Sequence, residues 1–469
     1  MRPGTSIRIL PWLALATCLV FATQAQAVSI KETDDWSIDL GGSLKLYGLA
    51  MHMNWPWPAL AAGGWDGRSV ISGLGEARLT FSGSYKDRVR WDTQLHTAVM
   101  TSSQPNAMTA LSGGLSALAD TPRALPLQYL DTDDPNSIWK AQVDRLLVKL
   151  RLWKLDIRLG RQPIGLGVGL IWQPADLIGT FSFLEIDREY KPGVDALRVD
   201  WALGRFTELT LVGVAAGAPC RHVSRPTASN PLAPSHWTTP AGDRCSPARA
   251  RLDADHSTAL VRLRTSLGKF DLGLLAGYVR GDILAGAFLS ATFGRWKIRA
   301  EATFTHDLTK GIDSPYWTPV NDFLRAVLGF DYSFDTSRPL NLVAELYYNG
   351  FGTIDSKGYL RRASLARMAE YGEVQNVGLL YAGLALRWQA ADRLETSLML
   401  VSNLTDPSAH LSASLAFSLT DESVLLLGGF LPIGTRPILE GPVLAPELTA
   451  RSEFGLYPLM VFSEYKRYF

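Results

Sequence analysis

The residues best suited to chemistry in this sequence are basic side chains that recur at alternate positions. Arg145, Lys149 and Arg151 are separated by even intervals, and Arg158 follows after a short break. Alternate residues of a β-strand point to the same face, so this spacing gathers positive charge on one face. Arginine binds carboxylates and phosphates through a planar fork of donors. The pattern predicts a surface that attracts anions.

A catalytic centre is not indicated. A nucleophilic mechanism needs Ser, Thr or Cys beside an oriented histidine. Of the seven histidines, only His96 shares the polar face of a strand with Asp92 and Gln94. A single hydrated histidine is the simpler interpretation, so we expect no enzyme, no catalytic residue and no cofactor.

A metal site is also not expected. Asp131, Asp133 and Asp134 could offer oxygen ligands to Ca²⁺, but they lack the spacing of a full coordination loop, which favours a solvated acidic turn. The glycines from Gly165 to Gly169 lack the Lys-Ser/Thr of a phosphate-binding loop.

The elements that would position these residues are β-strands. From Trp296 to Phe304 apolar and polar residues alternate strictly, as in a strand with one apolar and one polar face. We predict eighteen such strands, at 36–50, 74–85, 88–99, 142–152, 155–162, 193–202, 206–216, 257–266, 269–280, 282–293, 296–306, 322–334, 339–349, 376–388, 393–402, 409–419, 422–432 and 456–469.

The connections between these strands alternate between short turns and long loops. Dipeptides such as Trp153-Lys154 and Gly294-Arg295 form the short turns, and apolar-face aromatics including Trp36, Trp201 and Trp388 stand beside them. Short periplasmic turns, long extracellular loops and an aromatic girdle are typical of outer-membrane barrels. The sequence predicts an all-β transmembrane antiparallel barrel of about eighteen strands, closed because lipid tolerates no open sheet edge.

Composition agrees with this class. The 469 residues include 46 Lys plus Arg and 45 Asp plus Glu, which is not the basic excess of a nucleic-acid-binding protein. Outside the N-terminus no apolar run approaches the roughly 18 residues of a membrane-spanning helix. We therefore expect neither a nucleic-acid binder nor a helical membrane protein.

The predicted domain organisation is a targeting segment followed by one barrel. Residues 1–27 have a basic start, an apolar core and an Ala25-Gln26-Ala27 cleavage site, as in a signal peptide. Residues 28–35 form a short periplasmic segment, too short for a plug domain, and 36–469 form the barrel. Cys220 and Cys245 lie in the extracellular loop 217–255, where a disulfide is favoured over two free thiols.

The polar face of the strands would line the lumen. On this register the lumen is more basic than acidic, which favours anions, although opposed charges also serve simply to pair and hydrate the interior of a large barrel. The basic residues are Lys45, Arg78, Arg88, Arg90, Arg145, Lys149, Arg151, Arg158, Arg198, Arg262, Arg264, Lys297, Arg299, Arg325 and Arg387, and the acids are Asp39, Glu76, Asp92, Asp156, Asp200, Asp271, Glu301, Asp331, Glu345 and Glu395.

The loop 163–192 is the best candidate for a constriction. Its glycines permit a compact path, and apolar residues including Trp172, near Asp176, do not suit a loop in water. We expect it to fold inward, with an outward apolar patch for a partner or lipid as the alternative. A salt-bridge latch would hold it through Asp187, Arg188, Glu189 and Asp195.

Two segments carry a resemblance to known families. The end at Phe469, with Tyr465 and Val461 on its face, resembles the C-terminal strand that the outer-membrane assembly machinery of Gram-negative bacteria recognises. Leu159 to Gln162, Trp172 to Asp176 and Asp187 to Ala196 are similar to a strand-loop-strand block of the alginate-export and anion-selective porin families. The resemblance implies a passive channel of about sixteen to eighteen strands in the outer membrane, surrounded by lipid and possible as a homo-oligomer.

The function expected is passive diffusion of small hydrophilic solutes, with a mild preference for anions. Two alternatives stay open. One is an export pore for an anionic polysaccharide, which a dense ring of Arg at one depth would support. The other is a barrel without a transport function, such as an enzyme, an adhesin or the sheath of an electron-transfer partner.

Overall fold

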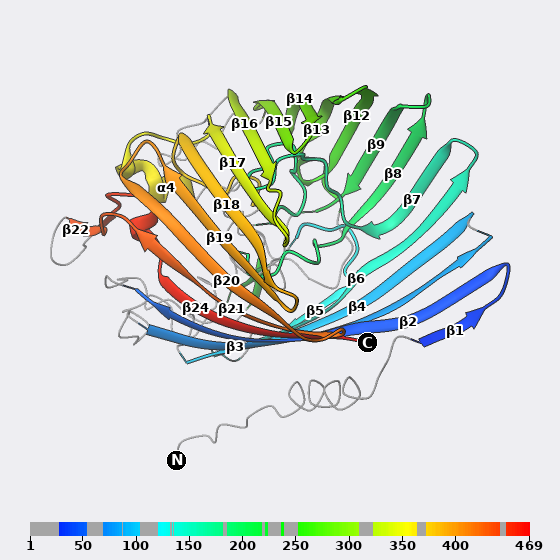
Figure 1. Ribbon diagram of the computed structural model, residues 1–469, viewed down its shortest axis with the longest axis horizontal. Coiled ribbons are helices and arrows are strands. Elements are labelled where there is room, and N and C mark those ends of the chain that lie inside the picture. The colour runs from blue at the N-terminus through cyan, green and yellow to red at the C-terminus, as the bar shows by residue number, and fades with distance from the viewer. Residues whose placement is uncertain are drawn as a thin grey trace, which may run out of the picture.

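A computed structural model of the chain shows one β-barrel (Figure 1). The structure describes residues 28–53, 69–86, 88–103, 121–131, 134, 136–181, 185–217, 221–223, 236–238, 252–308, 322–363, 372–440 and 447–469. The predicted signal peptide 1–27 and both Cys220 and Cys245 lie outside these residues, so the cleavage site and the disulfide stay predictions.

Eighteen antiparallel strands form the barrel wall in the described part of the chain. They are β2 (Trp36–His52), β3 (Ser69–Tyr85), β4 (Val89–Ser102), β6 (Ser137–Leu152), β7 (Leu155–Gln162), β8 (Val194–Ala202), β9 (Thr207–Ala215), β12 (Thr258–Leu267), β13 (Phe270–Val279), β14 (Asp282–Phe293), β15 (Trp296–His306), β16 (Asp322–Ser333), β17 (Leu340–Asn349), β18 (Leu380–Ala391), β19 (Leu394–Asn403), β20 (Ser408–Thr420), β21 (Ser423–Ile433) and β24 (Leu459–Tyr468).

The wall closes between its first and last strands. β2 pairs with β3 along one edge and with β24 along the other, from Ser43 opposite Tyr468 to His52 opposite Leu459. Beyond the end of β24, the main chains of Gly42 and Phe469 exchange hydrogen bonds of 2.6 and 3.0 Å. The predicted fold, a closed all-β barrel of about eighteen strands, is confirmed.

Two short strands complete the wall where longer strands stop. β1 (Val28–Glu32) pairs with β2 beside the end of β24, so a strand lies within the segment 28–35 that the sequence placed before the barrel. β5 (Gln128–Asp131) pairs with β6 beyond the end of β7. Each covers a row of backbone groups that the wall would otherwise leave open.

Each predicted strand overlaps an observed one, and Leu155–Gln162, Asp282–Phe293 and Trp296–His306 coincide with predictions. The largest late start is that of β18, predicted from 376 but observed from Leu380. The residues expected at its start do not join the strand, because the Asn349 side chain donates hydrogen bonds to the carbonyls of Asn376 and Gly378.

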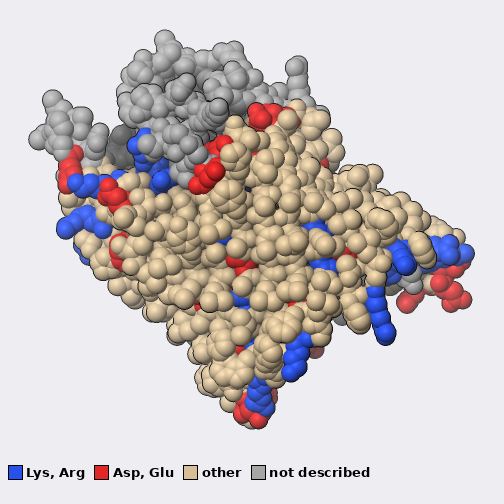
Figure 2. All heavy atoms as spheres, turned by 90° about the horizontal axis from the view of Figure 1, so that it is seen from above, with Lys and Arg blue, Asp and Glu red and all other residues tan. Residues whose placement is uncertain are grey.

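The outer face of the wall is apolar. Large side chains at alternate positions are exposed there, among them Leu328, Leu346, Leu384 and Val461. Figure 2 shows one face of the molecule as a broad area of uncharged residues, with Lys, Arg, Asp and Glu mainly towards its edges. A lipid-facing barrel needs such an exterior because hydrocarbon solvates no charge.

Short turns join the strands at one end of the barrel. Between β6 and β7 the turn is Trp153-Lys154, with Trp153 at a φ of 55°, and between β14 and β15 it begins at Gly294, with a φ of 61°. Two-residue hairpins favour such left-handed residues because their twist matches that of the strands. Trp36, Trp201 and Trp388 are exposed at this end.

The remaining elements are small. They are the hairpins of β10 (Arg221–Val223) with β11 (His236–Thr238) and of β22 (Ile438–Glu440) with β23 (Glu447–Thr449), the helix α4 (Tyr359–Ala363), and the 3₁₀ turns η2 (Ala254–His256), η3 (Ser356–Gly358) and η4 (Phe454–Leu456). Within the described residues, no helix has the length and apolar character needed to cross a membrane.

The two faces of the wall should tolerate charge very differently. Leu346→Arg places a cation on the outer face, so we expect the unfolding free energy in lipid to fall by about 2–4 kcal/mol. Ser414→Arg, on the inner face, should cost far less because the arginine reaches water. Guanidinium titration of refolded protein measures both, and equal losses would contradict the assignment of the faces.

Candidate functional site

The interior of the barrel is crossed by the segment between β7 and β8, described at residues 163–181 and 185–192, which we call the inward loop. In Figure 1 it runs through the space that the strands enclose. Its Ile164 and Leu177 are almost fully buried in a cluster with Val212, Leu260 and Leu275 of β9, β12 and β13. The apolar residues that do not suit a loop in water therefore pack on the inner wall.

Two wall carboxylates hold the middle of the inward loop. Glu345 of β17 accepts from the main-chain N–H groups of Leu170 at 2.7 Å and of Ile171 and Trp172 at 3.0 Å. Glu301 of β15 accepts from those of Val168 and Ala175. Hydrogen bonds to charged acceptors are the stronger kind, so these two acids act as anchors for the loop backbone.

Trp172 fills a recess between the inward loop and the wall. Its ring stacks on Tyr347, with centroids 5.3 Å apart, and its Nε1 donates to Oδ1 of Asn376 at 2.9 Å. Gly383 of β18 makes the recess possible, because a Cβ there would come within 2.8 Å of the indole. The ring is 4% exposed, so Trp172 fixes the loop rather than meeting the lumen.

The far end of the inward loop reaches the opposite wall. Asp187 pairs with Lys45 of β2 and, at 2.8 Å, with Lys466 of β24, and Glu189 pairs with Lys45 at 2.7 Å. Burial alone would raise the pKa of Asp187, but the two ammonium groups outweigh it and hold the pKa below its ordinary value. The Tyr190 ring lies 4.6 Å from the Lys45 ammonium.

Asp176 of the predicted constriction and the latch residues Asp195 and Arg188 make different contacts. Asp176 pairs with Lys191 inside the loop, and burial raises the pKa of Asp176. Asp195 of β8 pairs with Arg161 of β7 at 2.8 Å. Arg188 is exposed and lies near Glu185. Asp187 and Glu189 are thus the predicted latch residues whose ion pairs join the inward loop to the barrel wall.

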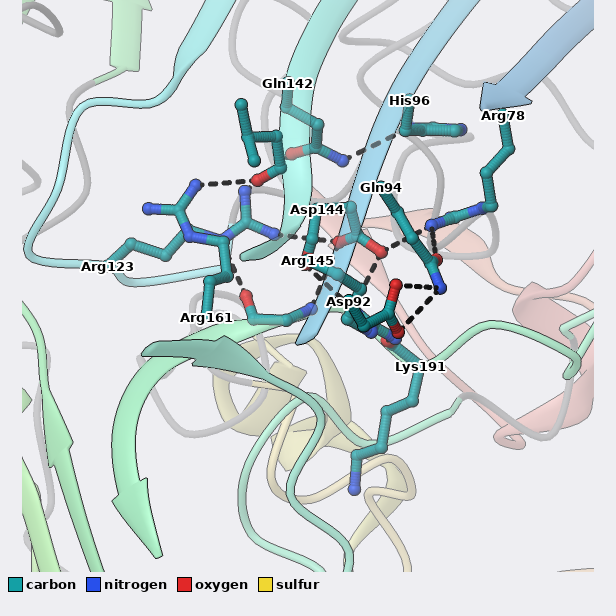
Figure 3. Close-up of polar contacts among 12 residues, drawn as sticks. Arg78, Asp92, Gln94, His96, Arg123, Gln142, Asp144, Arg145, Arg161 and Lys191 are labelled. Carbon is teal, nitrogen blue, oxygen red and sulfur yellow. Dashed lines mark hydrogen bonds and ion pairs between the residues drawn. The ribbon is translucent and has the colours of Figure 1, made fainter. Parts of the chain in front are cut away.

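A β-bulge places an acid in the lumen that the sequence pattern missed. The ladder between β4 and β6 shifts by one residue at Asp144. Its carboxylate lies 2.8 Å from Arg78, 2.7 Å from Arg145 and 3.4 Å from Arg123 (Figure 3). Strict alternation assigned Arg145 to the lumen and Asp144 to lipid; the bulge turns both inward.

This cluster fixes the return of the inward loop. Asp144 accepts from the main-chain N–H of Gly193 at 3.1 Å, Arg145 donates to the carbonyl of Lys191, and Arg123 donates to that of Gly193 at 2.7 Å. Arg78 and Arg145 are buried, which suits them to hold the loop more than to bind a passing solute. An ionisable residue at a lipid-facing position was the one signal in the sequence for this bulge.

A second segment meets the inward loop. Residues 372–379 return from the long loop between β17 and β18. Glu373 pairs with Arg325 at 3.0 Å, Gln375 donates to the carbonyl of Phe181, and Asn376 accepts from Trp172. No period or motif singled these residues out, because their partners lie far away in the sequence.

Basic residues that are at least partly exposed form a row on the lumenal face of four neighbouring strands. Arg90 of β4 is opposite Lys149 of β6, Lys149 is opposite Arg158 of β7, and Arg158 is opposite Arg198 of β8. Like charges directly opposite each other are normally unfavourable in a sheet. We call these four residues the basic row.

Acids beside the basic row are shared between two bases each. Asp156 pairs with Lys149 at 2.8 Å and Arg151 at 3.0 Å. Asp200 pairs with Arg158 at 3.7 Å and Arg198 at 2.9 Å. Within these pairs four bases share two acids, so positive charge exceeds negative charge among them.

The remaining predicted pore residues divide by burial. Arg299, paired with Asp331, and Arg325 are buried in ion pairs. The others reach the lumen more freely: Arg262 lies 4.4 Å from the Phe288 ring, Arg264 pairs with Asp271, Arg387 pairs with Glu395, and Lys297 is opposite Asp331.

Beneath the inward loop lies a chamber of about 690 Å³. Ile171 and Ile186 of the loop line one side, and Arg387, Met399 and Ser414 of the wall line the other. The lumen thus keeps open volume despite the loop.

Other predicted features have these positions. His96 contacts Glu76 and Gln142 rather than a nucleophile. Asp133 lies outside the described residues, which contain no cluster of His, Cys, Asp and Glu suited to a metal ion.

Similar solved structures include OpdK of Pseudomonas aeruginosa, which is described as an outer membrane protein. OccAB4 of Acinetobacter baumannii is 8% identical over 94% of this chain and 99% of its own, with a TM-score of 0.46. OccK2 (OpdF) of Pseudomonas aeruginosa is 9% identical over 92% and 97%, with a TM-score of 0.47. OpdK of the same species, solved with vanillate, is 10% identical over 92% and 99%, with a TM-score of 0.45. No protein-family model and no curated protein matches the sequence.

The class of the protein follows from its own strand pairing, because such low similarity to solved structures does not establish it. A closed antiparallel wall, an apolar outside and a charged inside crossed by a loop define a porin-like barrel of the Gram-negative outer membrane. The resemblance to the alginate-export and anion-selective porin families stays a prediction.

Removing the acid at the bulge should be costly. Asp144→Asn leaves three arginines clustered without their carboxylate, and breaking a buried ion pair costs about 3–5 kcal/mol. We expect a loss of unfolding free energy of that size in guanidinium titration. Asp271→Asn, at a half-exposed pair, should lose at most about 1 kcal/mol. Equal small losses would show that Asp144 is not essential to the cluster.

Removing the loop anchors should change the channel without breaking the wall. In the double variant Glu301→Ala and Glu345→Ala, the loop N–H groups lose their charged acceptors. We expect a larger and noisier single-channel current, with unchanged heat-modifiable migration of the folded barrel. Glu395→Ala, which removes a lumenal acid that pairs with Arg387, is the control and should keep a quiet current. A quiet double variant would contradict the anchoring role.

Proposed function

We propose that the protein is an outer-membrane channel through which small hydrophilic solutes diffuse passively. The observation that carries this proposal is a lumen lined by charged side chains inside an apolar wall, with a chamber of about 690 Å³ beneath the inward loop. A barrel of this strand number is wide enough to hold water. The inward loop then sets the size of solute that passes.

We also propose a mild preference for anions. The basic row lies at one depth on one side of the lumen, and Asp156 and Asp200 are each shared between two bases. Low-dielectric walls focus such a field along the lumen and raise the local concentration of the opposite charge. The arginine forks of Arg158 and Arg198 can receive a carboxylate or phosphate.

A small solute fits this lumen better than a polymer. A polysaccharide would have to thread past a loop that is anchored to Glu301 and Glu345 on one side and to Lys45 and Lys466 on the other. The basic residues form a row on one wall and not a ring.

Assembly and partners follow from the same proposal. The apolar exterior contacts outer-membrane lipid, and the assembly machinery reads β24 with its terminal Phe469. A homo-oligomer remains compatible with this exterior.

Planar-bilayer recording tests the channel and its selectivity together. In a salt gradient we expect steady current steps with an anion-selective reversal potential. Replacing Arg90, Lys149, Arg158 and Arg198 by Gln removes four positive charges, takes both bases from Asp200 and leaves Asp156 with Arg151 alone, so the selectivity should shift towards cations.

Arg387→Gln, on the other side of the lumen, is the control and should shift the reversal potential much less. An unchanged reversal potential in the fourfold variant would refute the role of the basic row. Absence of current from correctly folded protein would refute the channel itself.

A further inference from the structure

A buried carboxylate at the outer rim connects three loops. Glu453, which precedes η4, is 1% exposed. Its Oε1 accepts from Nδ2 of Asn376 at 3.1 Å and from the N–H of Val377 at 3.2 Å. Its Oε2 accepts from the Tyr381 hydroxyl and from Nδ2 of Asn403 at 2.8 Å. Four donors thus surround one acid, an arrangement that suits the ionised form.

Asn376 connects this acid to the inward loop. Its Nδ2 donates to Glu453, while its Oδ1 accepts from Nε1 of Trp172. The amide group is therefore used at both ends, and its orientation is fixed by both contacts. Trp172 in turn follows Leu170 and Ile171, whose backbone Glu345 anchors.

Other ionisable groups pack around Glu453. Asp406, between β19 and β20, accepts from the Glu453 N–H at 2.9 Å and from the Tyr359 hydroxyl of α4 at 2.8 Å. Tyr381 of β18 contacts the carboxylate directly. His410 of β20 lies 6.1 Å from the Tyr457 ring. Among the described residues, Glu453 has no Lys, Arg or His within ion-pair distance.

We propose that Glu453 is a proton-sensitive positioning residue, which acts through Asn376 on Trp172 and so sets how firmly the inward loop narrows the lumen. This inference rests on the proposed channel function, because its readout is the current through the lumen.

Protonation weakens the link for a geometric reason. A proton on Oε1 of Glu453 points at the Nδ2 donor of Asn376. The two hydrogens repel each other, and this repulsion ends when the amide of Asn376 turns. The turned amide points Nδ2 at the indole N–H of Trp172, so the tryptophan loses its acceptor. A proton on Oε2 faces Tyr381 and Asn403, and the neutral group then holds Asn376 less strongly, since charge-assisted hydrogen bonds are about twice as strong as neutral ones.

The protonation equilibrium of Glu453 also supports a proton-sensitive role. Burial raises the pKa of Glu453 to about 7, against the hydrogen bonds that favour its ionised form. Above that pH the carboxylate holds the loops together, and below it the neutral acid releases them. A change of pH across neutrality therefore titrates this group.

Single-channel recording from about pH 5 to about pH 9 tests the inference on the full-length mature protein. We expect a quiet current at the alkaline end and a larger, noisier current at the acid end, with a midpoint near 7. Glu453→Gln, which resembles the protonated acid, should show the acid-like current at every pH. Heat-modifiable migration checks that this variant is folded.

Three further variants separate the positioning role from other causes. Trp172→Phe keeps a ring but lacks the indole donor, so the pH response should disappear although Glu453 is intact. His410→Gln and Glu440→Gln, the latter an exposed acid of the same loop, should keep the response. A response that persists in folded Glu453→Gln, or that His410→Gln abolishes, overturns the proposal. A current without any pH response in the wild type overturns it too, whereas no current at any pH refutes the channel function instead.

Discussion

Every main-chain polar group of a lipid-facing sheet needs a hydrogen-bonding partner within the protein, and the rest of this structure depends on that constraint. The pairing of β2 with β24 removes the last open edge, while β1 and β5 extend the ladder where longer strands stop. Once the wall is closed, alternation gives each strand one face to lipid and one to the lumen. Charged residues on the inner face are then confined together, and their pairing determines the shape of the channel.

The charged residues of the lumen have two different roles. Asp144, Glu301 and Glu345 are buried and hold loop segments through guanidinium or main-chain N–H groups. The basic row stays partly exposed and sets the field along the lumen. A residue count on the inner face mixes these two sets, although only the second can act on a passing ion. The preference for anions therefore depends on which charges are already used inside the structure.

The inward loop is held in place by its contacts with the wall. Apolar contacts with β9, β12 and β13, two carboxylate anchors and two lysines hold it from three directions. The return segment 372–379 adds a contact that leads from Trp172 through Asn376 to Glu453 at the rim. The narrow part of the lumen is thus connected to loops on the outer side of the membrane.

The sequence by itself determined the strands, the inner and outer faces, the side of the short turns and the inward fate of loop 163–192, because alternation and local apolarity are properties of neighbouring residues. Only the tertiary structure decided that Arg78 and Arg145 are buried around Asp144, that Glu301 and Glu345 bind loop backbone, and that Glu373, Asn376 and Glu453 take part at all. A bulge breaks the period of two at one residue, and the other contacts join residues far apart in the chain. Such contacts form only when the closed wall brings their partners together, so no local pattern contains them.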